Sequence, residues 1–323
     1  MKALVTGING FVGSHLAEYL LEHTDWKVAG TVYGDLDNIV HLKDRLELYP
    51  AELSQLSVAT FVLEETRPDY VINLAAQAVP SLSYRDPWPT LETNIHLQFN
   101  ILHAAVQLGL DCRILVVGSG EEYGLVRPDD LPVAEDTPLR PLNVYGVSKI
   151  AQEMLGLQYH LAHGLPVVMV RPFNHIGSRQ RLGFVAPDFA RQVAEEEAGL
   201  REAAMDVGNL DVSRDFSDVR DIVRGYHLAI TQGEPGEVYN LGSERACSIR
   251  RLLETLLASS RVKVEVRQDA VRLRPADVPT MVSDCRKFRQ RTGWQTAIPF
   301  EQSVQDVLNY WRQKVGRVRG RQR

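Results

Sequence analysis

Short runs of apolar residues alternate with amphipathic stretches over most of this chain. The apolar runs have the length and composition of buried strands, and they are residues 3–6, 27–33, 70–76, 113–118, 166–171 and 238–241, with a shorter candidate at 46–48. Amphipathic stretches at 53–66, 91–108 and 144–162 lie between them and predict helices. Strands that alternate with helices in this way predict an α/β fold with a doubly wound parallel sheet.

The pattern loosens after residue 171. We expect helices at 184–198, 219–230, 250–258 and 304–311 and an edge-like strand at 262–266. The strand at 238–241 is expected to rejoin the large sheet. We therefore predict a dinucleotide-binding domain of residues 1–172 plus about 216–243, and a smaller α+β substrate domain of about 173–215 plus 244–316. The Arg-rich residues 317–323 are expected to be a frayed tail.

A glycine-rich turn joins the first strand to the first helix. Gly7, Gly10 and Gly13 follow the spacing G-x-x-G-x-x-G directly after the strand. Such glycines allow a tight turn and let the backbone, including Phe11 and Val12, approach a pyrophosphate at the helix N-terminus. The chain therefore begins like a Rossmann-type nucleotide-binding domain.

Asp35 follows the second strand, where an acidic residue can accept hydrogen bonds from the adenosine ribose of NAD. It can equally be a turn or N-cap residue. No arginine ends this strand to receive a 2′-phosphate, which favours NAD, while Lys43 and Arg45 leave NADP open. Small residues after the strand at 70–76 would let the backbone pass close to the cofactor, and we expect contacts from Leu74, Ala75 and Ala76.

Tyr145 and Lys149 are four residues apart, so they share one face of the predicted helix at 144–162. A neighbouring ammonium group, together with a nicotinamide cation, would lower the tyrosine pKa and let the phenol exchange a proton with a carbinol oxygen. Tyrosine and lysine at this spacing are also common on ordinary helix faces. Ser119 directly follows the strand at 113–118, at the edge where ligands bind.

Composition narrows the possible partners. The 323 residues carry a net charge of −5, with 44% hydrophobic and 24% charged residues, as in ordinary globular enzymes. We expect no nucleic-acid or membrane partner. The three cysteines, Cys112, Cys247 and Cys285, are isolated in sequence, so we expect inert thiols, no metal site and a cytoplasmic protein.

In this order and spacing, these motifs resemble those of the extended short-chain dehydrogenases/reductases. Further motifs resemble the branch that modifies GDP-mannose, and they are residues 118–124, 173–177, 183–185, 208–216 and 272–279. The resemblance implies an NAD(P)H-dependent reduction of the C4 keto group of GDP-4-keto-6-deoxy-D-mannose to GDP-D-rhamnose. It also implies a homodimer formed by the helices at 91–108 and 144–162.

The resemblance also implies individual roles. Tyr145 would protonate the C4 oxygen, Lys149 would lower the tyrosine pKa and hold the nicotinamide ribose, and Ser119 would orient the carbonyl group. Further cofactor contacts are expected from Asn94 and Phe173. Substrate contacts are expected from Ser83, Asn174, Val185, Asn209, Arg214, Arg274 and Asp277. Either arginine could instead form a surface ion pair.

Three residues depart from the branch pattern. Gly120 stands where serine is common, Asp277 where glutamate is usual, and Glu52 where aspartate usually contacts adenine. Glu121 aligns with the base of GDP-mannose 4,6-dehydratases, so that activity is the alternative, although Glu121 could simply cap a neighbouring segment. The dehydratase cofactor loop carries paired arginines where this chain has Tyr33 and Gly34. A catalytically silent nucleotide-binding regulator on the same fold is the third possibility.

Overall fold

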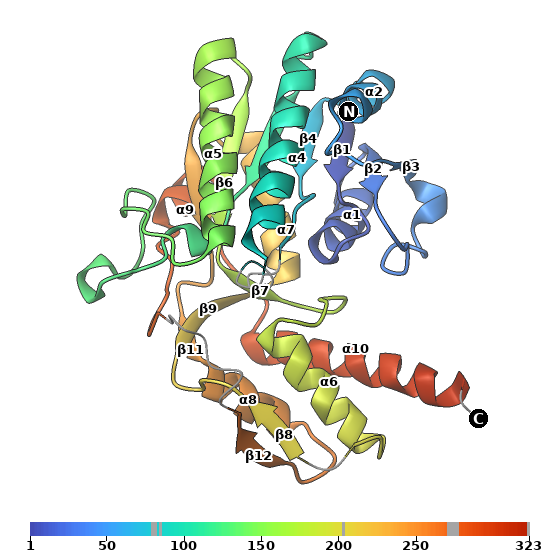
Figure 1. Cartoon of the computed structure of the whole chain (residues 1–323), viewed down its shortest axis with the longest axis vertical. Coiled ribbons are helices and arrows are strands. Elements are labelled where there is room, and N and C mark those ends of the chain that lie inside the picture. The colour runs from blue at the N-terminus through green and yellow to red at the C-terminus, as the bar shows by residue number, and fades with distance from the viewer. Residues whose placement is uncertain (79–82, 84–85, 202–203, 270–277, 322–323) are drawn as a thin grey trace.

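The computed structural model describes the chain except for residues 79–82, 84–85, 202–203, 270–277 and 322–323. Its centre is a seven-stranded sheet in the order β10-β6-β5-β4-β1-β2-β3 (Figure 1). All neighbouring strands pair in parallel. The strands are β1 (Lys2–Thr6), β2 (Lys27–Val32), β3 (Glu47–Pro50), β4 (Tyr70–Asn73), β5 (Arg113–Val117), β6 (Val167–Pro172) and β10 (Val238–Leu241). The predicted doubly wound parallel sheet is confirmed, and β10 does rejoin it.

Helices cover both faces of this sheet. One face packs against α1 (Phe11–His23), α7 (Val219–Gln232) and α9 (Arg286–Thr292), and the other against α2 (Leu56–Thr66), α4 (Pro87–Gln107) and α5 (Val144–His163). Apart from the edge strand β3, the strands are largely buried on both sides, which is why they appear in the sequence as continuous apolar runs. The strand order reverses between β1 and β4, and a crevice beyond their carboxyl ends is where such sheets bind ligands.

A smaller group of elements, called here the small lobe, lies below the carboxyl edge of the sheet in Figure 1. It contains a three-stranded sheet of β11 (Ala246–Ser248), β9 (Ser213–Asp218) and β7 (Asn174–Ile176), and a parallel pair of β12 (Glu265–Gln268) and β8 (Ala204–Val207). The helices α6 (Val185–Glu197), α8 (Ile249–Ala258) and α10 (Phe300–Arg321) complete it. They share an apolar core that includes Phe189, Leu252 and Leu308. The predicted division of the chain into two domains stays a prediction.

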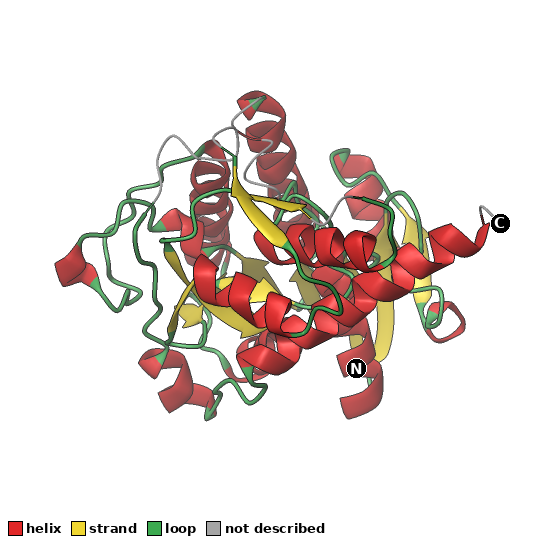
Figure 2. Ribbon diagram, turned by 90° about the horizontal axis from the view of Figure 1, so that it is seen from below, coloured by secondary structure: helices red, strands yellow, loops and turns green. Residues whose placement is uncertain are grey.

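The structure differs from the sequence expectations mainly in the small lobe. Residues 213–218 form strand β9, which we did not predict because its sequence, Ser-Arg-Asp-Phe-Ser-Asp, lacks an apolar pattern. The last helix begins at Phe300 and continues to Arg321, past both its predicted end at residue 311 and the start of the expected frayed tail. Figure 2 shows α10 extending to the C-terminus at one side of the molecule. Arg312 binds both carboxylate oxygens of Glu197 at 2.7 Å, which joins α10 to α6 beyond the predicted end.

None of the helices in the described part of the chain combines the length and the apolar character that crossing a bilayer requires.

Candidate active site

The loops that follow β1, β4 and β5 meet the N-terminal end of α5 beyond the carboxyl edge of the large sheet. The loop after β1 carries the three glycines, and the loop after β4 begins at Leu74. After β5 comes the short 3-10 helix η2 (Gly120–Glu122), whose N-cap is Ser119. The tertiary structure therefore brings four separate segments of the chain to one edge.

The glycine turn has the shape of a dinucleotide cradle. Gly7 adopts a φ of +64°, a conformation that favours glycine. A Cβ atom at Gly13 would lie 2.4 Å from the Gly7 carbonyl oxygen, so only glycine fits there. No side chain caps the N-terminus of α1, and its first turn contains no acidic residue. These features suit the pyrophosphate of a dinucleotide, which the helix N-terminus attracts.

The loop after β4 forms the second wall of this cradle. The Thr6 hydroxyl accepts hydrogen bonds from the backbone N–H groups of Leu74 and Ala75, both at 3.0 Å. A Cβ atom on Gly7 would meet the Ala75 Cα atom at 3.2 Å, which shows how closely the two loops pack. Leu74, Ala75 and Ala76 therefore lie beside the glycine turn, as a cofactor contact requires.

Asp35 lies in the exposed turn after β2. Its carboxylate accepts a hydrogen bond from the backbone N–H of Asp37 at 3.1 Å, and Asn9 from the glycine turn donates to its carbonyl oxygen at 2.6 Å. Asp35 is thus a turn residue that also borders the cradle, so both interpretations of it fit the structure.

Tyr145 and Lys149 lie in the first turns of α5, which Asn143 caps by accepting from the backbone N–H of Gly146 at 2.8 Å. The ammonium group of Lys149 lies 5.8 Å from the centre of the Tyr145 ring and donates to the Val117 carbonyl oxygen at 2.9 Å. Both side chains are buried. The helix face that the spacing predicted therefore points at the end of β5.

The acid–base properties of the pair follow mainly from burial. Burial raises the pKa of Tyr145, while a hydrogen bond with Ser119 lowers it, and burial dominates. The ammonium group of Lys149 donates to the backbone of β5, and its expected lowering of the tyrosine pKa together with a nicotinamide cation stays a prediction. Burial also lowers the pKa of Lys149 to about 8, against the pull of Glu122. At neutral pH the phenol therefore holds its proton and the lysine its charge.

Asn94 from α4 connects the site to the loop after β4. Its amide group accepts from the backbone N–H of Gln77 at 2.7 Å and donates to the Ser148 hydroxyl at 2.9 Å. Ser148 in turn donates to the carbonyl oxygen of Tyr145 at 2.7 Å. Asn94 thus holds the cofactor side of the site against α5.

Glu121 is the residue that leaves a dehydratase as the alternative activity, and Gly120 is one of the departures from the branch pattern. One carboxylate oxygen of Glu121 accepts from the side-chain amide of Asn143 at 2.8 Å, and the Glu121 charge raises the pKa of Tyr145. A Cβ atom at Gly120 would lie 3.3 Å from the ring of Phe173, so a serine at this position would make a tight contact with the ring.

Four of the expected substrate residues, Asn174, Val185, Asn209 and Arg214, lie in the small lobe. Asn174 is exposed on β7, Val185 begins α6, and Asn209 holds the turn before β9 by accepting from the backbone N–H of Asp211. The guanidinium group of Arg214 donates to the Val278 carbonyl oxygen at 2.7 Å. Ser83 is buried near the start of α4. Arg274 and Asp277 lie outside the described residues, so their expected contacts stay predictions.

Two residues that support the site escaped the sequence reasoning. Asn143 both caps α5 and holds Glu121, and an N-cap asparagine directly before a helical pattern is a readable signal. Glu122 accepts from the backbone N–H of Ser119 at 2.7 Å, which completes a capping box. The signal was the spacing Ser119-x-x-Glu122.

A glycine cradle beside a serine, a tyrosine and a lysine at the edge of a parallel sheet defines a nicotinamide-dependent oxidoreductase, of the extended short-chain dehydrogenase/reductase class. Comparison with known proteins makes this more specific. The family model described as GDP-mannose 4,6 dehydratase matches residues 4–307, and the chain belongs to this family.

Several relatives resemble the chain over nearly its whole length. It is 37% identical to GDP-6-deoxy-D-mannose reductase of Pseudomonas aeruginosa over 97% of this chain and 98% of that protein. It is 26% identical to human GDP-mannose 4,6 dehydratase over 95% of this chain and 90% of that protein. The structure of RMD from Pseudomonas aeruginosa complexed with NADPH matches with a TM-score of 0.86 and 35% identity, covering 97% of this chain and 99% of that one.

Proposed function

We propose that this protein reduces the C4 keto group of GDP-4-keto-6-deoxy-D-mannose to give GDP-D-rhamnose. The observation that carries the proposal is the 37% identity to a GDP-6-deoxy-D-mannose reductase over 97% of the chain. The set of Ser119, Tyr145 and Lys149, of which Tyr145 and Lys149 are buried, supports it, because a carbonyl reduction needs a proton donor beside the nicotinamide.

The residues of the chain divide the work of this reaction. A nicotinamide held by the glycine cradle would supply the hydride for C4. Tyr145 gives its phenolic proton to the O4 oxygen, and its raised pKa keeps that proton in place at neutral pH. Ser119 donates a hydrogen bond that orients the carbonyl group, and the charge of Lys149 stabilises the tyrosinate that the proton transfer leaves. Asn174 and Arg214 would contact the nucleotide sugar, where a guanidinium group suits phosphate oxygens.

A GDP-mannose 4,6-dehydratase is the second candidate, and Glu121 is the observation that favours it. That reaction needs a carboxylate base near C5 of the sugar. The carboxylate of Glu121 is held by Asn143 and acts electrostatically on Tyr145, so it lies close to the proton donor. The same bond also fits a capping role for Glu121, and the reductase is the stronger proposal because the dehydratase relative is only 26% identical.

One assay separates the two activities. Purified protein receives GDP-4-keto-6-deoxy-D-mannose with NADH or NADPH, and separately GDP-mannose with NAD⁺ or NADP⁺, and the products are identified by mass spectrometry and NMR. We expect GDP-D-rhamnose from the first mixture. Turnover of GDP-mannose alone would establish the dehydratase instead, and inactivity with both GDP-sugars would refute the substrate assignment.

The Tyr145→Phe variant tests the proton donor. We expect turnover to fall by roughly 10² to 10⁴, the contribution of a positioned general acid, with NADH affinity nearly unchanged. Tyr159→Phe is the matched control, since Tyr159 is a buried tyrosine of the same helix and bonds His103 at 3.1 Å. Full activity of Tyr145→Phe would contradict the mechanism.

We propose a preference for NADH over NADPH. Asp35 borders the cradle in the exposed turn after β2, and its carboxylate would repel a 2′-phosphate. Asp35→Ala should therefore lower the ratio of kcat/KM with NADH to kcat/KM with NADPH. A wild-type preference for NADPH would contradict this part of the proposal.

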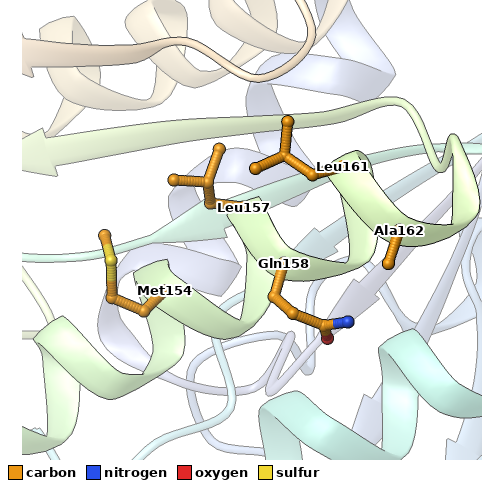
Figure 3. A pocket seen from close by; sticks show the side chains of 5 residues that line it. All are labelled: Met154, Leu157, Gln158, Leu161 and Ala162. Atoms are coloured by element: carbon orange, nitrogen blue, oxygen red, sulfur yellow. The ribbon is translucent and has the colours of Figure 1, made fainter.

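We also propose a homodimer formed through α4 and α5. Figure 3 shows Met154, Leu157 and Leu161 projecting from one face of α5, where they line a shallow apolar pocket away from the carboxyl edge of the sheet. Leu161 is 74% exposed and Met154 43% exposed, an arrangement that suits association with a second copy. Leu161→Glu should yield a monomer in analytical ultracentrifugation, whereas Phe61→Glu on α2 should not. A monomeric wild type would exclude the proposal.

A cytoplasmic location completes our proposal. The three cysteines are buried free thiols, which suits a reducing compartment. Fractionation of the producing cells with an antibody against the protein would test this location, and recovery outside the cytoplasm would refute it.

A further inference from the structure

A glutamate that the proposed mechanism does not use lies buried directly behind the site. Glu122 is completely shielded from solvent. One of its carboxylate oxygens accepts from the backbone N–H of Ser119 at 2.7 Å. The same oxygen would lie 2.2 Å from a Cβ atom at position 118, so Gly118 leaves the space that the carboxylate fills. The backbone that presents Ser119 is therefore built around this carboxylate.

Glu122 and a second buried carboxylate, Glu153, lie beside the same guanidinium group. Arg171 on β6 binds Glu153 with two hydrogen bonds of 2.8 and 2.6 Å, while its Nε atom lies 3.4 Å from the second carboxylate oxygen of Glu122. That oxygen has no hydrogen-bond partner among the described residues. One guanidinium group thus faces two buried carboxylates, and of the two it makes hydrogen bonds with Glu153.

Lys149 supplies the second positive charge of this buried region. Its ammonium group donates to the carbonyl oxygen of Val117, the residue before Gly118. Other described groups that face this cluster are Tyr145 of α5, Glu121 of η2, Tyr123 at the end of η2, and the backbone carbonyl of Glu135, which accepts from Arg171.

Electrostatics couple Glu122 to the two residues that handle the proton. The Glu122 charge raises the pKa of Lys149, against the larger effect of burial. It also raises the pKa of Tyr145. Burial and the neighbouring Glu153 raise the pKa of Glu122 itself. Both effects on the site have the same consequence, since they extend to higher pH the range in which the lysine is charged and the phenol is protonated.

We propose that Glu122 is a positioning residue of the reaction, which holds the backbone of Ser119 and, in its ionised form, serves as the buried counter-charge of Lys149. The kinetic test of this inference rests on the proposed function, because it uses the 4-keto sugar as substrate. The position of the Glu122 carboxylate does not depend on that function. A merely structural carboxylate would change the stability of the protein but not the pH dependence of the folded enzyme.

Two substitutions separate the two parts of the proposal. Glu122→Gln keeps an oxygen for the Ser119 N–H group but removes the charge, and Glu122→Leu removes both. Loss of the anion lowers the pKa values of Lys149 and Tyr145, so the alkaline limb of the kcat profile should move to lower pH by at least about half a unit in both variants. At pH 6 we expect kcat to fall less than tenfold for the glutamine variant and more than tenfold for the leucine variant, with KM within about threefold.

Glu153→Gln is the matched control from the same cluster. It removes the carboxylate that competes with Glu122, so its alkaline limb should stay in place or move to higher pH. The proposal is overturned if the alkaline limb of the kcat profile of Glu122→Gln lies at the same pH as that of the wild type. It is also overturned if the alkaline limb of Glu153→Gln moves to lower pH by as much as that of Glu122→Gln. Should the leucine variant fail to fold, the glutamine variant decides the question by itself.

A readout without substrate distinguishes this proposal from the proposed function. Competitive labelling with acetic anhydride, followed by peptide mass spectrometry, reports the fraction of Lys149 that is uncharged at each pH. The midpoint should lie lower in Glu122→Gln than in the wild type, and equal midpoints would overturn the proposal. If the wild type reduces no 4-keto sugar, the proposed function fails while this measurement still tests Glu122.

Discussion

Replacing Arg171 by methionine should destabilise the protein more than any exposed ion pair could. The guanidinium group is about 5% exposed and binds both oxygens of Glu153. It also donates to the Tyr123 hydroxyl at 2.9 Å and to the Glu135 carbonyl oxygen at 3.0 Å. Arg171→Met leaves all of these acceptors buried, and it leaves Glu122 without its nearest positive charge.

The expected magnitude follows from this geometry. Removing one partner of a buried ion pair costs about 3 to 5 kcal/mol, because an uncompensated charge stays in the interior. With about 2.1 cal/mol/K of unfolding entropy per residue over 323 residues, this corresponds to a fall in melting temperature of roughly 4 to 7 °C.

The loss should also depend on pH with a definite sign. Burial already raises the pKa of Glu122 and Arg171 opposes this rise, so without Arg171 that pKa lies further above its unfolded value and the folded state binds a proton more readily than the unfolded state. The stability of the variant is then lost as pH rises above the unfolded pKa of glutamate. We therefore expect Arg171→Met to lose less unfolding free energy, relative to the wild type, at pH 5 than at pH 8.

Urea unfolding followed by circular dichroism at both pH values measures these free energies. Arg251→Met is the control, because Arg251 pairs with Glu301 at 2.8 Å but both side chains are more than half exposed. That substitution should cost less than about 1 kcal/mol. A deficit for Arg171→Met below 1 kcal/mol, or one that is larger at pH 5, would refute the reasoning.

Further predictions concern the cradle and acid stability. Gly13→Ala should weaken NADH binding more than tenfold in fluorescence titration, because its Cβ atom would lie 2.4 Å from the Gly7 carbonyl oxygen and 2.8 Å from the Ile8 Cα atom. Gly316→Ala in α10 meets no atom within 4 Å and should leave binding unchanged, so equal effects would contradict the cradle. Burial lowers the pKa of His15 to about 4, so the unfolded chain takes up a proton that the folded protein refuses as pH falls from 6.5. Between pH 6.5 and pH 4, the free energy of unfolding should therefore fall by roughly 3 kcal/mol. Urea unfolding of His15→Gln should show a smaller fall, and an unchanged pH dependence would exclude His15 as its source.

The large sheet was predictable because its signals are local. Strands buried on both faces are continuous apolar runs, such as those at 113–118 and 166–171, and the amphipathic stretches between them have one apolar face. The glycine turn and the spacing of Tyr145 and Lys149 are local too. Strand β9 was missed because its buried polar residues are satisfied by distant partners. Asp215, for example, accepts from the hydroxyl groups of Ser243 and Ser283, both at 2.6 Å.

The sequence alone thus determined the strands of the large sheet, the glycine turn and the helix face that Tyr145 shares with Lys149, because each depends on residues within a few positions of one another. Only the tertiary structure decided which way the pKa of Tyr145 moves, since burial outweighs its neighbours, and where the charge of Lys149 points. It likewise decided that Glu122, Glu153 and Arg171 share one buried cluster. Charges from three separate segments meet there, and no spacing along the chain records which distant groups will share the same interior.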